Sequence, residues 1–269
     1  MDDKMEKESR QNFHMNEVNA GISFKAVILA GGKGTRLMPL TKDIPKPMVK
    51  VGNKPLLEWH VLLLRKYGIT EIIMCTNYLH EVIENYFKNG KEFGVHIQYS
   101  KETEEMGTAG AVKLAEKLIG NDDFFVIFGD EILNVNLLQM ARYHKKHCAE
   151  ATLLVHESSH PFDSDLVELN NENKLIRIFR AKEGDSFRPL NLSCLYVMKP
   201  TLLQKVPLTF SDFGKQIFPK LVNEGTHIHG YITEEYIKDV GTLDRLKKVE
   251  EDLKAGYIFG LPNKEGNYL

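Results

Sequence analysis

Short runs rich in apolar and β-branched residues recur through the first half of the chain, separated by segments with helical spacing. Four such runs are predicted strands: residues 24–30, 71–75, 95–100 and 124–128. Helices are predicted between them at 53–68, 80–87 and 106–118, with Asn53 as the cap of the first. Parallel neighbours need long crossover connections, so this alternation predicts a doubly wound α/β sheet.

The second half of the chain has many strand patterns with few helices between them. Its predicted strands are 151–157, 165–170, 174–180 and 191–198, with a hairpin-like turn at "NNENK". A helix at about 212–222, strands at 227–232 and 235–241, and a charged amphipathic helix at 242–256 follow. The predicted fold class is therefore α/β, with a doubly wound, mixed and mainly parallel Rossmann-like sheet that includes an antiparallel portion.

The pattern divides the chain into three parts. Residues 1–23 are polar, aperiodic and of mixed charge, so we expect an extension outside the fold. Residues 24–256 are predicted to form the folded domain, because no internal repeat or clear linker divides them. Residues 257–269 are expected to be a short tail or the start of a further domain.

Composition narrows the class of protein. The 269 residues are 42% apolar and 27% charged with a formal net charge of −2, which is typical of a globular protein and disfavours a general nucleic-acid binder. Three widely spaced cysteines without metal-ligand spacing suit free thiols in a reducing compartment. No stretch approaches the roughly 20 apolar residues that span a bilayer. The sequence therefore predicts a cytoplasmic protein with no membrane or nucleic-acid partner.

The predicted strand at 24–30 runs into "AGGKGTRLMPLTKDIPKPM", a segment rich in glycine, proline and cations. Gly31, Gly32 and Gly34 let backbone N–H groups approach an anion closely. The cations of the segment are Lys33, Arg36, Lys42 and Lys46. The segment lacks the Walker lysine, and Leu37 stands where a dinucleotide fingerprint requires glycine or alanine. The segment therefore predicts a polyphosphate site of another kind.

The stretch "LAGGKGTRLMPLTKDIPKPM" resembles the signature of the sugar-1-phosphate nucleotidyltransferases. The resemblance continues in order through "MGTAGAVK", "FGDEIL", "DLVELNNENKLIRIFRAK" and "YIKDVGT". Within that family the chain is most similar to the guanylyltransferases for mannose 1-phosphate and D-glycero-D-manno-heptose 1-phosphate. The resemblance implies a Rossmann-like nucleotidyltransferase fold whose antiparallel portion binds the sugar. It also implies transfer of a nucleoside monophosphate from a nucleoside triphosphate to a sugar 1-phosphate, with release of pyrophosphate.

The same resemblance implies the nucleotide-binding residues. Contacts to base and ribose are implied at Leu29, Ala30, Gly31, Gly107 and Thr108. Contacts around the phosphates are implied at Gly32, Gly34 and Thr35. Asn77 borders the base or forms an ordinary strand-to-helix turn. Arg36 matches the family's catalytic arginine, which neutralises the α-phosphate and the departing pyrophosphate, and Lys46 matches the lysine that holds the phosphates.

Two aspartates at the ends of predicted strands indicate a metal site. Asp130 follows "FFVIFG" and Asp239 ends "YIKD", so both are expected at the C-terminal edge of the sheet, where α/β folds bind ligands. Magnesium takes a few carboxylates together with phosphate oxygens and water, so two aspartates are enough. Mg²⁺ is therefore the expected cofactor, and the resemblance assigns Asp130 to catalysis as well.

The resemblance places the sugar phosphate on the antiparallel portion. Glu168 matches a family glutamate that accepts sugar hydroxyls, and Lys182 matches a lysine that meets the sugar phosphate. The chain departs from the family at Ala181, where a glutamate is usual, and at 192–194, where the family has Asn-Ala-Gly. Asn191 lies one residue out of register and is the expected substitute.

The overall resemblance favours GTP and a sugar 1-phosphate of the heptose or mannose type as substrates. The same reaction with UTP, dTTP or CTP stays open, as does a homodimer formed through the final helix. A catalytically silent homologue that binds a nucleotide sugar and regulates a partner is a second hypothesis, although Arg36, Lys46, Asp130 and Asp239 are all retained. A dehydrogenase-like dinucleotide binder is a third, weakened by Leu37.

Overall fold

The structure is a computed structural model that describes residues 24–158, 161–182 and 184–258. The predicted extension at 1–23 and most of the predicted tail at 257–269 lie outside the described residues. Within the described ranges, no helix has the length and apolar character needed to cross a membrane.

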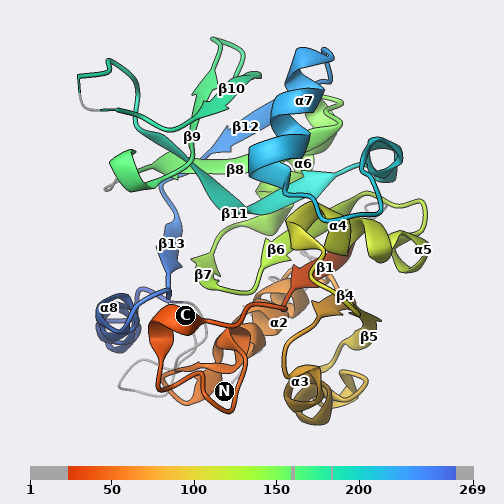
Figure 1. The fold of residues 1–269 in the computed structure, drawn as a ribbon, viewed down its shortest axis with the longest axis vertical. Helices are drawn as coiled ribbons and strands as arrows, with labels where there is room; N and C mark the ends of the chain where they lie inside the picture. Colours follow the sequence, from red (N-terminus) through yellow and green to blue (C-terminus); the bar gives the residue numbers. More distant parts are fainter. Residues whose placement is uncertain (1–23, 159–160, 183, 259–269) are drawn as a thin grey trace, which may run out of the picture.

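A nine-stranded mixed sheet forms the centre of the molecule (Figure 1). Its continuous path is β10-β9-β11-β6-β1-β4-β5, while β8 joins through β11 and carries β12. The strands are β1 (Lys25–Leu29), β4 (Glu71–Thr76), β5 (His96–Lys101), β6 (Phe124–Phe128), β8 (Ala151–Glu157), β9 (Leu166–Leu169), β10 (Leu175–Phe179), β11 (Leu190–Met198) and β12 (Ile228–Ile232). Only β10 and β11 run against the other strands of this sheet. The predicted mixed, mainly parallel α/β sheet is confirmed.

Helices cover both faces of the sheet. One face carries α2 (Leu56–Lys66), α3 (His80–Phe87) and α6 (Leu137–Lys146). The other carries α4 (Gly107–Leu114), α5 (Glu116–Ile119) and α7 (Phe218–Asn223). Side chains alternate along a strand, so Ala26 and Ile28 of β1 join the first core and Val27 joins the second. Burial on both faces explains why these strands are nearly continuous apolar runs.

A third apolar cluster lies beside the sheet and supports the glycine-rich loop. It joins α8 (Leu243–Lys254), the hairpin of β2 (Lys50–Val51) and β3 (Lys54–Pro55), and the antiparallel pair of β7 (Glu131–Asn134) and β13 (Tyr236–Asp239). Leu246, Val249 and Leu253 of α8 lie in the same cluster as Leu37 of the loop. Figure 1 shows β13 between α8 and the main sheet. The apolar face of α8 is therefore buried against other parts of the same chain.

Three local features differ from the sequence-based predictions. Asn53 lies in the β2–β3 turn, and α2 begins directly after Pro55, whose fixed φ suits a helix start. The pattern missed α6, whose N-terminus is capped by the Asn136 side chain. The helix predicted at 212–222 begins as a π-helical turn at Phe213–Ile217, capped by Asp212, and continues as α7.

Candidate active site

The glycine-rich loop folds back on itself after β1. The Lys46 backbone N–H donates to the Gly32 carbonyl (3.0 Å), and the Thr41 hydroxyl donates to the Gly34 carbonyl (2.8 Å). Gly34 has a φ of +67°, and a Cβ there would lie 2.7 Å from Lys46 Cβ and 2.9 Å from Thr41 Cγ2. Only glycine tolerates both the backbone angle and the contact. The return limb therefore brings Lys46 directly against the glycines.

Lys46 connects the loop to the two predicted metal-ligand aspartates. Its side chain is buried, and its Nζ lies 2.9 Å from Asp130 Oδ2 and 3.7 Å from Asp239 Oδ1. The fold brings the aspartates together because β13 pairs with β7, which sets Asp239 opposite Glu131. The Val240 N–H also donates to the Asp130 carbonyl (3.2 Å). Three residues that are far apart in sequence therefore meet at one point.

Two arginines lie near Asp239. Arg245, in the first turn of α8, hydrogen bonds to Asp239 Oδ2. A Cβ at Gly241 would lie 2.8 Å from Asp239 Oδ1 and 3.0 Å from Arg36 Nη2, so the missing side chain leaves room for both groups. Neither Gly241 nor Arg245 was predicted. The glycine of the "YIKDVGT" motif was the signal that could have indicated Gly241.

Glu131 adds a third carboxylate beside the aspartates. Burial, together with the nearby charges of Asp130 and Asp239, raises the pKa of Glu131 to about 7. The Ser193 hydroxyl donates to Glu131 Oε2 (3.3 Å). The buried His60 of α2 donates from Nε2 to the Glu131 carbonyl (2.6 Å), and burial lowers the pKa of His60 to about 4. A neutral histidine therefore holds the turn that presents Asp130 and Glu131.

A cavity of about 660 Å³ opens beside the loop, and we call it the glycine-loop cavity. The predicted nucleotide-binding residues that line it are Leu29, Gly31, Gly32, Gly34, Thr35, Asn77, Gly107 and Thr108. Ala30 is buried and its N–H donates to the Cys75 carbonyl (2.8 Å), so it belongs to the sheet instead. The sequence pattern did not indicate other lining residues, among them Glu102, Glu105, Phe210, Asp212 and Lys215.

The Thr108 hydroxyl is occupied by protein groups. It donates to Asp212 Oδ2 (3.0 Å) and accepts from the Phe213 N–H (2.9 Å). At the neighbouring Gly107, which has a φ of +69°, a Cβ would lie 2.5 Å from the Ser211 carbonyl oxygen. These two predicted residues therefore join residues 106–110 to residues 209–213.

Glu102 is the acidic side chain nearest the glycines. Its Oε2 accepts a hydrogen bond from the Met106 N–H (3.1 Å), and a Cβ at Gly31 would lie 3.4 Å from its Oε1. Burial raises the pKa of Glu102, while hydrogen bonds from Met106 and the Asn77 side chain act in the opposite direction. Asn77 therefore helps to position Glu102, and one carboxylate oxygen lies beside Gly31.

A second cavity of about 780 Å³ lies at the strand ends, and we call it the strand-end cavity. Charged and polar side chains from several strands and from α8 line it, including Arg36, Asp130, Glu131, His156, Asp165, Arg180, Asn191, Lys238, Asp239 and Arg245. Asp130 lines both this cavity and the glycine-loop cavity. The two cavities therefore meet at Asp130, one of the carboxylates that contact Lys46.

Asn191 reaches the strand-end cavity next to an irregularity in β11. The pairing of β11 with β8 shifts its register between Leu192 and Tyr196, as it does at a β-bulge. Asn191 pairs directly with His156 across the two strands, which places both side chains on one face. The Nδ1 of His156 is buried and has no hydrogen-bond partner among the described residues, and burial lowers the pKa of His156. No motif indicated His156.

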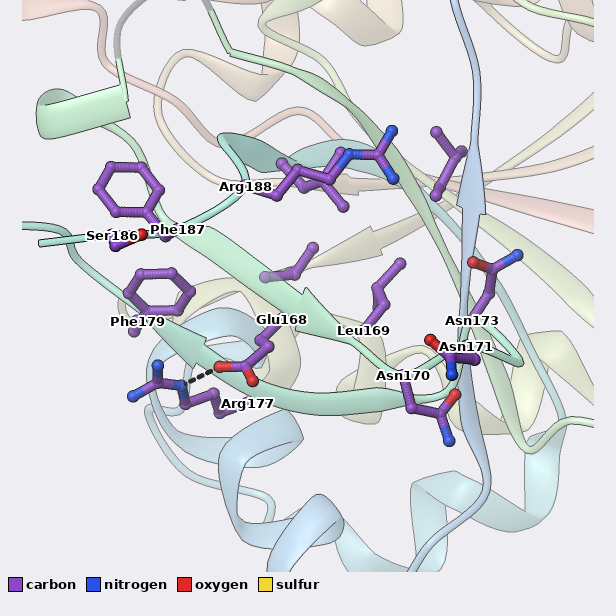
Figure 2. Close-up of a pocket in the computed structure, with 13 residues that line it drawn as sticks. Glu168, Leu169, Asn170, Asn171, Asn173, Arg177, Phe179, Ser186, Phe187 and Arg188 are labelled. Atoms are coloured by element: carbon purple, nitrogen blue, oxygen red, sulfur yellow. Dashed lines mark hydrogen bonds and ion pairs between the residues drawn. The ribbon is translucent and has the colours of Figure 1, made fainter.

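The two other predicted sugar-side residues lie elsewhere. Glu168 lines a separate cavity of about 480 Å³ on the β9–β10 hairpin, where its Oε2 accepts a hydrogen bond from Arg177 Nε (2.6 Å; Figure 2). Lys182 is exposed and lines none of these three cavities. Asp165 and Arg180, an ion pair at 2.7 Å, line the strand-end cavity instead. The structure therefore does not bring Glu168 or Lys182 to the carboxylate cluster.

The two aspartates suit a magnesium ion. In the part of the chain that the structure describes, no three His, Cys, Asp or Glu side chains are grouped as a metal site. Magnesium needs fewer protein ligands, because it is bound through one or two carboxylates together with substrate phosphates. Asp130 and Asp239 offer only oxygen, and both already face one cation, the Lys46 ammonium. Their donor atoms and position therefore fit the predicted ion.

Comparison with known families identifies the class of this site. The family model described as "Nucleotidyl transferase" matches residues 25–256, which is most of the chain. The chain belongs to the nucleotidyl transferase family. The resemblance drawn from the glycine-rich loop is confirmed, and the loop, both aspartates and both cavities of this nucleotidyl transferase lie within the matched residues.

Several relatives of this nucleotidyl transferase are named mannose-1-phosphate guanyltransferase. The protein from Aspergillus oryzae is 36% identical over 222 residues, which cover 81% of this chain and 60% of the relative. The protein from Schizosaccharomyces pombe is 36% identical over 221 residues, which cover 81% of this chain and 61% of the relative. The nucleotidyl transferase chain thus spans about 60% of the length of these curated relatives.

Solved structures share the fold of this nucleotidyl transferase. A putative glucose-1-phosphate thymidylyltransferase from Bacillus anthracis, in complex with a sucrose, has a TM-score of 0.75 at 24% identity and covers 85% of this chain and 94% of its own. HddC from Yersinia pseudotuberculosis has a TM-score of 0.74 at 24% identity, and the match covers 86% of this chain and 99% of HddC. A second HddC structure is complexed with GMP-PN. At this identity the likeness confirms the fold alone.

Proposed function

We propose that the chain transfers GMP from GTP to a sugar 1-phosphate, forming a GDP-sugar and pyrophosphate. The observation that carries the proposal is the position of Asp130, which lines both the glycine-loop cavity and the strand-end cavity. Glycines and exposed backbone suit a nucleotide in the first cavity, and convergent polar side chains suit a sugar phosphate in the second. The two substrates would then meet at the carboxylate cluster.

This transfer depends on positioning and charge neutralisation and needs no general base. The sugar phosphate is an anion at neutral pH, so its oxygen can attack the α-phosphorus directly. The bond between the α-phosphorus and the oxygen that bridges it to the β-phosphate then breaks, and pyrophosphate leaves. Arg36, which lines the strand-end cavity, would neutralise the phosphates with two N–H groups at once. Lys46 holds Asp130 and Asp239 together. Magnesium held by these aspartates would neutralise further phosphate charge.

Glu102 supports guanine as the base. Guanine presents two neighbouring donors, N1–H and N2–H, and a carboxylate oxygen is a strong acceptor for such N–H groups. Uracil, thymine and cytosine lack this pair of donors. The Oε1 of Glu102 lies beside Gly31 at the wall of the glycine-loop cavity. The guanyltransferase names of the relatives and the GMP-PN complex of HddC support the same choice.

The strand-end cavity supports a sugar of the mannose or heptose type. His156 and Asn191 offer an imidazole and an amide on one strand face, and both groups can donate and accept hydrogen bonds to hydroxyls. Asp165 and Arg180 add a carboxylate and a guanidinium. We therefore propose these residues as sugar contacts in place of Glu168 and Lys182. The names of the curated relatives support mannose 1-phosphate as the reference substrate.

A substrate matrix tests the proposal. Pyrophosphate release would be measured with GTP, ATP, UTP, dTTP and CTP, each paired with mannose, heptose and glucose 1-phosphates, with and without Mg²⁺. We expect the highest turnover with GTP and none without a divalent ion. Glu102→Gln should reduce the preference for GTP, and Glu105→Gln is the control because Glu105 lines the same cavity but is exposed. If another triphosphate gave the highest turnover, the proposed preference for guanine would be wrong. If no pair of triphosphate and sugar 1-phosphate gave turnover, the proposed transferase activity would be wrong.

The catalytically silent homologue is the rival outcome of the same matrix. Stabilisation by GDP-mannose in a thermal-shift assay, with no turnover on any pair, would favour it. A homodimer, a cytoplasmic location and domain limits at 24–256 stay predictions.

A further inference from the structure

Phe210 and Asp212 line the glycine-loop cavity, and their segment lies about a hundred residues beyond the one that it touches. The Ser211 N–H donates to the Met106 carbonyl (2.9 Å), and the Ser211 carbonyl accepts from the Ala109 N–H (2.9 Å). A Cβ at Gly110 would lie 2.4 Å from the Thr209 carbonyl oxygen. Only glycine permits this approach, so the two backbones are in direct contact.

Residue 210 is held from both sides by these contacts. On the C-terminal side of residue 210, Ser211 hydrogen bonds to Met106 and Ala109. On its N-terminal side, the Thr209 carbonyl packs against Gly110. The Thr108 hydroxyl adds the hydrogen bonds to Asp212 and to the Phe213 N–H described above. The backbone that carries Phe210 is therefore fixed relative to the base of the cavity.

The Phe210 side chain is nevertheless uncovered. It is 58% exposed, although it lines the same cavity as Gly31, Gly107 and Glu102. Leu208, two residues earlier, is similarly exposed at 57% but does not line the cavity. An exposed aromatic ring on a segment fixed by backbone hydrogen bonds, in a cavity that glycines also line, offers a surface suited to a flat apolar group. A nucleobase is the flat group that accompanies a triphosphate.

We propose that Phe210 is the stacking platform for the nucleobase. The inference rests on the proposed function, because it assumes a nucleoside triphosphate in the glycine-loop cavity. Phe210 contacts a face of the base, while Glu102 at the cavity wall contacts its edge. Every base has a π-face, so stacking strengthens the binding of any base without reading its hydrogen-bonding groups. Phe210 therefore sets affinity, and Glu102 sets the preference for guanine.

Equilibrium titration of GTP against the Phe210→Ala variant tests the inference. Removing an aromatic platform is expected to weaken GTP binding on the order of tenfold or more. Binding of inorganic tripolyphosphate, which has no base, should stay unchanged. Leu208→Ala is the matched control, because it removes an equally exposed apolar side chain from the same segment outside the cavity. It should bind both ligands like the wild type.

Phe210→Trp gives a direct signal for stacking. The only native tryptophan, Trp59, is 4% exposed and packs in the third apolar cluster. The introduced indole should retain GTP affinity, and its fluorescence should be quenched by GTP but not by tripolyphosphate. Loss of GTP affinity in Phe210→Ala together with retained affinity in Phe210→Trp supports stacking.

Two outcomes would overturn the platform while leaving the proposed function intact. One is wild-type GTP affinity in Phe210→Ala. The other is an equal loss of GTP and tripolyphosphate affinity, which would show that Phe210 only supports the wall. Failure of the proposed function is a different result, because the wild-type chain itself would then bind no nucleoside triphosphate.

Discussion

The nucleotide side and the sugar side of this site are built in different ways. The glycine-loop cavity takes much of its lining from two continuous segments, residues 29–35 and 102–111. The strand-end cavity takes one or a few residues at a time from β7, β8, β11, β13 and α8 and from the segments between them. A continuous segment sets its geometry through local hydrogen bonds, whereas an assembled cavity depends on the register of distant strands.

The two sides also differ in how completely their polar groups are paired. In the glycine-rich loop, the carbonyls of Gly32 and Gly34 accept from Lys46 and Thr41. On the sugar side, the buried Nδ1 of His156 has no partner among the described residues, and Asn191 lies beside a break in the strand register. Changes on the sugar side should therefore alter substrate choice, whereas changes in the loop should abolish phosphate binding.

The largest effect is expected at Asp130, because it lines both cavities. Asp130→Asn keeps the size of the side chain but removes the charge that contacts Lys46 and that would hold magnesium. We expect pyrophosphate release to fall by about 10³-fold, the scale for losing one preorganised electrostatic group. Asp122→Asn removes an exposed acid just before β6 and should leave the rate unchanged. A wild-type rate in Asp130→Asn would contradict a shared reaction centre.

Gly34→Ala tests the loop with a matched control. The new Cβ would lie 2.7 Å from Lys46 Cβ, which should displace the lysine and lower kcat/KM for GTP by about 10²-fold. Gly184 also has a positive φ, +92°, but a Cβ there meets nothing within 4 Å. Gly184→Ala therefore carries the backbone strain without the clash. Similar losses in both variants would show that strain, and not the position of Lys46, limits activity.

The same contrast explains which parts of the molecule could be predicted from sequence. The positions of most strands and of the glycine-rich loop follow local patterns. The strand-end pattern predicted Asp130 and Asp239 at one edge of the main sheet, but β13, which ends at Asp239, lies outside that sheet in a separate pair with β7. That pairing sets Asp239 opposite Glu131, and both aspartates lie near the Lys46 ammonium. The missed helix α6 did carry such a pattern, because Leu137, Met140 and Ala141 stand at helical spacing and are buried on one face.

Residues that depend on tertiary contacts could not be predicted in this way. The place of Asn191 depends on the β11–β8 register, and the exposed position of Lys182 depends on the loop after β10. Phe210 lines the nucleotide side only because Ser211 hydrogen bonds to Met106 and Ala109. No pattern within either segment indicates that contact. Motif matches therefore locate a nucleotide site more readily than a sugar site.

His156 tests the sugar side at a smaller scale. His156→Leu removes a polar group from the strand-end cavity without touching the glycine-rich loop. The KM for the sugar 1-phosphate should rise about tenfold, as expected for one lost hydrogen bond to a substrate, while the KM for GTP stays unchanged. His156→Gln keeps a donor and an acceptor and should recover part of the loss. Equal increases in both KM values would contradict separate sugar and nucleotide sides.

Thr108 tests how the nucleotide wall is held to the segment that carries Phe210. Thr108→Val keeps the shape of the side chain but removes its hydrogen bonds to Asp212 Oδ2 and from the Phe213 N–H. We expect a loss of about 1 kcal/mol in the free energy of unfolding, measured by urea denaturation, because one partner of each hydrogen bond is removed. Thr108→Ser retains the hydroxyl and should stay within a few tenths of a kcal/mol of the wild type. Equal stability of Val and Ser variants would rule out this role.

The smallest effect at neutral pH is expected from His60, which links α2 to the turn that carries Asp130. Its pKa of about 4 lies below the ordinary histidine value of 6.5, so the folded state binds fewer protons than the unfolded chain between these values. The free energy of unfolding is therefore unaffected by His60 above pH 6.5 and falls by about 3 kcal/mol in total as the pH is lowered toward 4, because the unfolded chain takes up the proton first. His60→Gln can still donate to the Glu131 carbonyl but does not titrate.

The pH profile of unfolding, compared between His60→Gln and the wild type, isolates this contribution. Glu131 acts in the opposite sense, because its raised pKa of about 7 destabilises the folded state at higher pH and is relieved on acidification. Subtracting the two profiles removes the Glu131 contribution, which both proteins share. The difference should be near zero at pH 7 and should grow in favour of the variant from pH 6.5 to 4. A flat difference across this pH range would show that His60 is not held neutral.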